Sequence, residues 1–122
     1  PVSGIIPLIY IDVSYNNIVD ISSVEGLINL TRFYFNENKV SDISVIEELP
    51  NIVYINLSNN LIKDISPIAS RETLVRVYAD GNLLHDVSSL EALINLLKGQ
   101  PRKEAALSSF YTTCLYIDTN FQ

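Results

Sequence analysis

The chain has 122 residues, 48% of them hydrophobic, and a formal net charge of -6. This length and composition predict one globular domain with a continuous core. The negative charge argues against nucleic acid or an anionic membrane as the main partner, and no apolar run approaches the length of a bilayer span, so membrane insertion is not expected.

The first residues of the chain already follow a repeating pattern. Residues 2–8 align with residues 24–30, so the chain begins in the second half of a unit. We therefore expect that Pro1 is a boundary left by truncation or processing, and that further repeats or an amino-terminal cap precede it. An uncovered edge of this kind predicts end-to-end association of copies, an artefact that restoring the upstream sequence would remove.

Four units of equal length span 8–29, 30–51, 52–73 and 74–95 without a gap. They share the frame LxxLxLxxNxLxDIxxLxxLxx, in which Ile, Val, Phe or Ala replaces Leu at some positions. A unit of this size cannot bury its apolar face alone, so the units must stack. We assign residues 1–95 to this repeat domain, with the partial unit 1–7 in front of the four full ones.

Each unit opens with a predicted strand. Apolar and polar residues alternate in residues 8–14, the period of a strand with one buried face. Ile11 and Val13 are predicted to point inward, and Tyr10 and Asp12 outward. The asparagine after each strand is expected to satisfy backbone groups of the turn with its amide, and the four should stack as a ladder. The ladder residues are Asn16, Asn38, Asn60 and Asn82.

A short helical or 3-10 turn is predicted in the second half of each unit. Three serines stand three residues before a glutamate, which is the spacing of a capping box. The pairs are Ser22 with Glu25, Ser44 with Glu47, and Ser88 with Glu91. In the third unit Pro67 follows Ser66, and proline is favoured in a first helical turn because it lacks an N–H.

An aspartate recurs just before each of these turns. The four are Asp20, Asp42, Asp64 and Asp86. Stacked roughly 5 Å apart, they would offer oxygen ligands of the kind that calcium takes. We favour the alternative, in which each aspartate accepts backbone N–H groups of its own unit, so no metal site is assigned.

One position departs from the frame. Arg71 stands where the other three units have leucine. A charge at this place must reach solvent or find a partner, for which Glu72 and Glu48 are the candidates.

The pattern breaks after Leu96, and residues 96–122 are predicted to form a carboxy-terminal cap or an irregular last repeat. Residues 101–111 read as a helix that begins at a proline, and residues 114–120 repeat the strand pattern of residues 8–14. Cys114 begins this strand. As the single cysteine it excludes an internal disulfide, and we read it as a buried small hydrophobe.

The frame resembles the leucine-rich repeat. Its short period and its Asp-Ile-Ser turns, as in Asp20-Ile21-Ser22, resemble the short class found in phosphatase-regulatory subunits and bacterial internalins. The resemblance implies an α/β solenoid with a parallel sheet on the concave face and short helical or 3-10 turns on the convex face.

Catalytic chemistry is not predicted. The lone histidine, His85, falls at a variable position of the turn and reads as a surface residue. The sequence has no glycine-rich phosphate loop, no CxxC motif and no converging Ser-His-Asp set. We therefore expect neither an enzyme nor a cofactor.

The outward strand residues are the candidate binding site. They fall in two columns, the third and fifth positions of each unit. The third column holds Tyr10, Arg32, Tyr54, Arg76 and Tyr116, and the fifth holds Asp12, Tyr34, Asn56, Tyr78 and Asp118. Tyrosine and arginine dominate binding energy at protein interfaces, and each arginine is placed to stack on a tyrosine ring. The alternatives are an inert scaffold and a rim site at Leu61 and Leu83.

These features predict a protein-protein interaction module, such as an intracellular adaptor or regulatory subunit, that binds another protein on the concave face. The alternatives are a bacterial surface or secreted host-binding factor of internalin type, and the recognition segment of a larger enzyme. A cytoplasmic location is slightly favoured over a secreted or surface one. Two glycosylation sequons, at Asn29 and Asn56, are read as coincidental.

Overall fold

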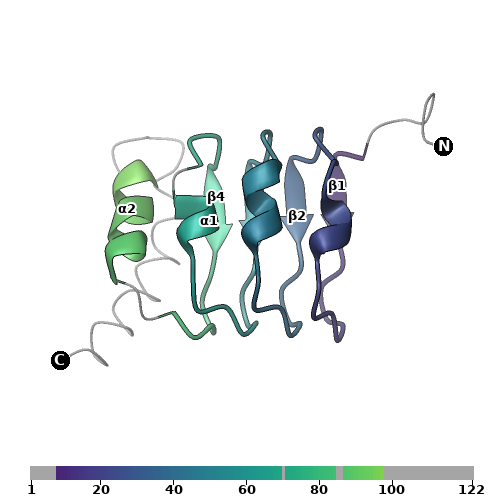
Figure 1. Ribbon diagram of the computed structural model, residues 1–122, viewed down its shortest axis with the longest axis horizontal. Coiled ribbons are helices and arrows are strands. Elements are labelled where there is room, and N and C mark those ends of the chain that lie inside the picture. The colour runs from purple at the N-terminus through teal and green to yellow at the C-terminus, as the bar shows by residue number, and fades with distance from the viewer. Residues whose placement is uncertain (1–7, 70, 85–86, 98–122) are drawn as a thin grey trace.

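The computed structural model describes residues 8–69, 71–84 and 87–97. Four strands form one parallel sheet in the order β1-β2-β3-β4 (Figure 1). They are β1 (Tyr10–Asp12), β2 (Arg32–Tyr34), β3 (Tyr54–Asn56) and β4 (Arg76–Tyr78). Each strand residue pairs with the equivalent residue of the next unit, so the sequence period is also the strand-to-strand step of the sheet.

Four helical segments form a second layer on one side of the sheet (Figure 1). Two are 3-10 helices, η1 (Ser22–Val24) and η2 (Ser44–Glu48), and two are α-helices, α1 (Ser66–Ala69) and α2 (Val87–Leu97). The predicted two-layer solenoid is therefore confirmed. The segment in the fourth unit is longer than the predicted short turn, because α2 has 11 residues and runs past residue 95.

Several sequence predictions fall outside the described residues. They concern the partial unit 1–7, the helix at 101–111, the strand at 114–120, and the residues His85, Asp86, Cys114, Tyr116 and Asp118.

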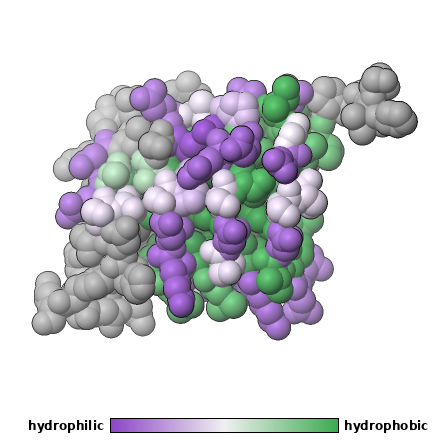
Figure 2. All heavy atoms as spheres, in the orientation of Figure 1, coloured by the Kyte–Doolittle hydropathy of each residue, from purple (hydrophilic) through white to green (hydrophobic). Residues whose placement is uncertain are grey.

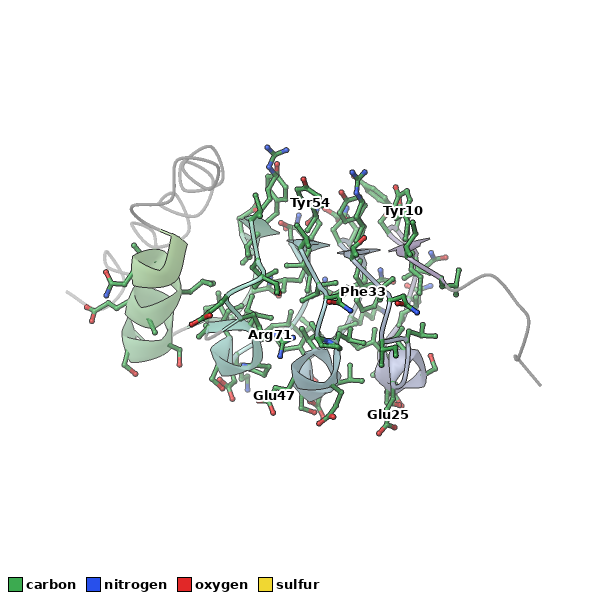
Figure 3. The ribbon with its side chains drawn as sticks, turned by 90° about the horizontal axis from the view of Figure 1, so that it is seen from above. Tyr10, Glu25, Phe33, Glu47, Tyr54 and Arg71 are labelled. Atoms are coloured by element: carbon green, nitrogen blue, oxygen red, sulfur yellow. The ribbon has the colours of Figure 1, made fainter. Side chains whose placement is uncertain are left out.

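The core lies between the sheet and the helical segments. Inward strand residues such as Phe33 and Ile55 are at most 1% exposed, and Ile46 of η2 and Ile68 of α1 are fully buried opposite them. Figure 3 places Phe33 in this interior layer. Ile11 points inward as predicted but is only half-buried, because β1 has a strand neighbour on one side only among the described residues.

The structure confirms the asparagine ladder for Asn38, Asn60 and Asn82, whereas Asn16 is exposed and bonds within its own unit. The side-chain oxygen of Asn38 accepts the N–H of Ile18 at 2.9 Å, and its amide nitrogen donates to the carbonyl of Val13 at 3.0 Å. Asn60 and Asn82 repeat both bonds one unit further along. Each of these asparagines therefore hydrogen-bonds to backbone groups of the preceding unit as well as to those of its own.

The predicted capping boxes are wrong for the first two helical segments. Neither η1 nor η2 has a side-chain hydrogen bond at its cap. Instead, the carboxylate of Asp20 accepts the N–H of Ser22 at 2.8 Å, and Asp42 accepts the N–H of Ser44 at 2.9 Å. The reason is position: each serine is the first residue of its helix, and the aspartate two residues earlier is the one that can reach the free N–H.

Arg71 is held by backbone carbonyls rather than by a predicted carboxylate partner. Its guanidinium donates to two carbonyls at the end of η2, those of Glu47 at 3.2 Å and Leu49 at 2.5 Å. The last carbonyls of a helix lack partners within the helix, so a cation satisfies them well. Figure 3 shows Arg71 among the helical segments, and its buried Nε has no partner in the described part of the chain.

Candidate interaction surface on the sheet face

The outward strand residues lie together on the open side of the sheet, which we call the sheet face. Eight predicted site residues are brought together there: Tyr10, Asp12, Arg32, Tyr34, Tyr54, Asn56, Arg76 and Tyr78. They share one face because side chains alternate along a strand and the parallel register aligns equal positions. Figure 3 shows Tyr10 and Tyr54 pointing away from the body, on the side opposite Glu25 and Glu47.

Two arginines hold one tyrosine between them. Arg32 on β2 and Arg76 on β4 both pair in register with Tyr54 on β3. The guanidinium carbon of Arg32 lies 4.9 Å from the centre of the Tyr54 ring, and that of Arg76 lies 5.9 Å from it. These distances are typical of cation–π contacts. The predicted stacking is therefore confirmed, and both contacts are made with the same ring.

The other aromatic contact of this face lies nearer the first unit. The rings of Tyr10 and Tyr34 meet edge to face, with centroids 5.4 Å apart and planes at 74°. This arrangement places the positive edge of one ring against the negative face of the other. Tyr10 remains 49% exposed, whereas Tyr34 is half-buried, so the pair presents an apolar surface that stays accessible.

The carboxylates of this face lie near the carboxyl ends of the strands. Asp12 accepts the hydroxyl of Ser14 at 2.6 Å and its N–H at 3.0 Å, and these bonds hold the pKa of its carboxyl below the usual value. Asp80, just beyond β4, accepts the hydroxyl of Ser58 at 2.6 Å. The sheet face is thus polarised, with arginines toward the start of the strands and carboxylates toward their end.

A row of residues beside the sheet face was missed at the sequence level. Tyr15, Glu37 and Asn59 directly precede the ladder asparagines, and all three have a left-handed backbone, with φ between 57° and 59°. Gly81 occupies the same place in the fourth unit, with φ of 71°. This glycine was the available signal, since glycine adopts positive φ without strain. Tyr15 is 75% exposed.

The rim alternative also has the exposure that was predicted for it. Leu61 and Leu83 are 46% and 48% exposed. They occupy equivalent positions in adjacent units, so they form a small apolar patch at one end of the turns.

The helical side has a different chemical character. Figure 2, which views this side, shows hydrophilic residues over much of a hydrophobic interior. Glu25, Glu47 and Glu48 are exposed there.

The aspartates before the helical segments are engaged with their own units. Asp20, Asp42 and Asp64 each accept the N–H of the serine two residues later, as the favoured interpretation predicted. Across residues 8–69, 71–84 and 87–97, no three His, Cys, Asp or Glu side chains gather closely enough to hold a metal ion. Within the same ranges, no helix has the length and apolar character that crossing a membrane requires.

Known proteins share the repeat and the fold. A family model for two copies of the leucine-rich repeat matches residues 28–70. The solved structure of internalin C2 from Listeria monocytogenes is 34% identical, covers 67% of this chain and 36% of its own, and has a TM-score of 0.63. A second internalin from that organism, InlF, is 26% identical, covers 66% and 31%, and has a TM-score of 0.48. No curated protein matches.

The chain spans about a third of the length of these two structures. Its frame carries the same features as the matched family: a strand, an asparagine turn and a returning segment in every unit. The four-stranded parallel sheet backed by short helical segments agrees with that assignment. The chain belongs to the leucine-rich repeat proteins.

Proposed function

We propose that this chain is a protein-interaction module that binds a partner protein on the sheet face. The observation that carries the proposal is the composition of that face, where four tyrosines and two arginines project from four adjacent strands. Such side chains bury large areas with few rotatable bonds and keep a polar group for hydrogen bonding.

The internal contacts of the sheet face favour binding over an inert scaffold. Arg32 and Arg76 are held against Tyr54, and Tyr10 is held against Tyr34, so these side chains have already lost rotational freedom before a partner arrives. Ordering each such side chain on binding costs about 0.5–1.5 kcal/mol, a cost that preorganisation reduces. The buried core lies on the opposite side of the sheet, and none of the sheet-face residues belongs to it.

The test compares two variants of the tagged protein. In the first, Tyr34, Tyr54 and Tyr78 are replaced by alanine; in the second, Glu25 and Glu47 on the helical side are replaced by alanine. Proteins captured from extracts of the natural source are compared by mass spectrometry, and thermal unfolding is recorded for both variants. We expect the tyrosine variant to lose its specific partner with little change in melting temperature.

The opposite pattern would remove the proposal. If the tyrosine variant still captures the partner and the glutamate variant does not, binding belongs to the helical side. If the tyrosine variant keeps its partner but unfolds at a much lower temperature, the sheet face is scaffold, and Leu61 with Leu83 becomes the surface to test next.

A second candidate is a surface or secreted host-binding factor of internalin type. The similarity to internalin C2, at 34% identity, favours it. Antibody detection in the culture medium, cell-wall and cytosol fractions of the natural source would test this candidate. Presence in the cytosol alone would exclude it and leave the adaptor interpretation. An enzymatic role is not proposed for this chain.

A further inference from the structure

The positive charges of this acidic protein are unevenly placed. Five lysines and arginines lie in the described residues, and only Arg32 and Arg76 project from strands. Both occupy the third position of their unit, one on each side of β3. The sheet face therefore presents two cations on a molecule whose net charge is -6.

The two guanidinium groups are exposed and set at a fixed spacing. Two strand steps separate β2 from β4, so the groups lie roughly 10 Å apart. The Tyr54 ring contacts both guanidinium groups, and these contacts limit their movement. Both arginines are exposed and Tyr54 is half-buried between them.

The carboxylates at the carboxyl ends of the strands accept hydrogen bonds from serines. Asp12 is held by Ser14, and Asp80 is held by Ser58. Among the described residues, both guanidinium groups contact the Tyr54 ring and no carboxylate. The donors of Arg32 and Arg76 thus remain free for a ligand from outside.

We infer that Arg32, Tyr54 and Arg76 form a receptor for an acidic segment of the partner protein, in which two carboxylates are spaced to match the two guanidinium groups. This inference rests on the proposed function of the sheet face. Guanidinium binds carboxylate through two parallel hydrogen bonds, which are stronger than neutral ones, and the Tyr54 hydroxyl adds a donor between them. Binding of this kind weakens as salt screens the charges.

A protein segment suits this face better than a nucleic acid does. A uniform polyanion that crosses the whole sheet would also meet the carboxylates of Asp12 and Asp80. A segment that is acidic only at one edge places its charges on the arginines and neutral groups over the carboxylates.

The inference can be tested with peptide probes in solution. The probes are a single-stranded oligonucleotide and peptides of about eight residues, long enough to cross four strands. In each peptide every third residue is glutamate, glutamine or lysine and the others are serine, because three extended residues span roughly the 10 Å between the guanidinium groups. Backbone amide chemical shifts of the isotope-labelled chain locate each binding site, and titration yields the affinity at low and at high salt.

Two double variants distinguish the effect of charge on the sheet face from the effect of the net charge of the molecule. Arg32→Gln with Arg76→Gln removes two positive charges from the sheet face, and Lys39→Gln with Lys63→Gln removes two from exposed positions elsewhere. We expect the glutamate peptide to shift amides of β2, β3 and β4, and the arginine double variant to weaken it at least about tenfold. The lysine double variant is expected to change the affinity less than about twofold, and high salt to weaken binding to the wild type.

Failure of this inference and failure of the proposed function look different. The acidic-segment inference is overturned if the glutamine or lysine peptide binds the sheet face as well as the glutamate peptide does. It is also overturned if both double variants weaken binding equally, or if the oligonucleotide binds the arginines more tightly. In the first and third of these cases the sheet face still binds a ligand. If every probe that binds shifts only amides of the helical segments, the proposed function fails as well.

Discussion

Replacing Asn60 by alanine tests the asparagine ladder. The Asn60 side chain is 4% exposed and makes four hydrogen bonds. Its oxygen accepts the N–H of Val40 at 3.0 Å, and its amide nitrogen donates to the carbonyls of Phe35, Leu57 and Ser58 at 3.1–3.2 Å. Alanine removes all four bonds.

The three carbonyls keep a second donor. The amide of Asn38 also donates to Phe35, the amide of Asn82 to Leu57, and the N–H of Glu37 to Ser58. The N–H of Val40, a residue that is 0% exposed, has no such alternative among the described residues.

An unpaired buried donor costs about 1–3 kcal/mol, and each lost neutral hydrogen bond about 0.5–1.5 kcal/mol. We therefore expect Asn60→Ala to lower the free energy of unfolding by about 3–5 kcal/mol, a large part of the stability of a domain this size.

The chain supplies its own control at Asn16. This residue has the same place in the frame, but it is exposed, and within the described part of the chain its amide donates to the carbonyls of Val13 and Ser14 of its own unit. Among the described residues, no backbone N–H depends on the Asn16 side-chain oxygen. The carbonyl of Val13 also keeps the amide of Asn38. We expect Asn16→Ala to cost less than about 1 kcal/mol.

Equilibrium unfolding in urea measures both losses, and hydrogen exchange follows the amide of Val40 directly. Its exchange should become faster in Asn60→Ala and stay unchanged in Asn16→Ala. The reasoning fails if the two variants lose similar stability, or if Asn60→Ala loses less than about 1 kcal/mol. Either result would mean that the ladder follows the fold without stabilising it.

Three further predictions concern single positions. Gly81→Ala places a Cβ against the side-chain oxygen of Asn59 at a left-handed φ, so we expect the free energy of unfolding in urea to fall by about 1–3 kcal/mol. Adding Asn59→Gly should recover part of this loss because it removes the clashing side chain. Asp42 has a lowered pKa because it accepts the N–H of Ser44, so near that pKa the folded state binds fewer protons than the unfolded one. The free energy of unfolding should therefore fall as the pH drops below the ordinary carboxyl pKa of about 3.9. Asp42→Asn should flatten that part of a plot of melting temperature against pH. Arg71→Ala leaves two carbonyls of η2 without their donor, so it should cost about 1–3 kcal/mol by urea unfolding, whereas Arg76→Ala on the sheet face should cost much less.

The fold could be predicted because the repeat determines which positions of successive units lie side by side. The constant spacing between equivalent positions becomes the register of the sheet, in which Tyr10 pairs with Arg32 and Arg32 with Tyr54. Alternation within each strand then decides which side chains point outward, because successive side chains of a strand point to opposite faces. The members of the sheet face were therefore predictable residue by residue.

The sequence alone determined the period, the parallel order of the strands and the two faces of the sheet, since these depend only on spacing and alternation. Tertiary structure decided which partner each side chain takes. Arg32 and Arg76 both contact the Tyr54 ring. Arg71 donates to backbone carbonyls and not to carboxylates, and aspartates bond the first N–H of the helical segments in place of the predicted serine caps. The physical reason is that such choices depend on rotamers and on groups one unit away. The sequence pattern indicates which residues are neighbours. The distances and angles between their side-chain groups depend on how the turns stack in three dimensions.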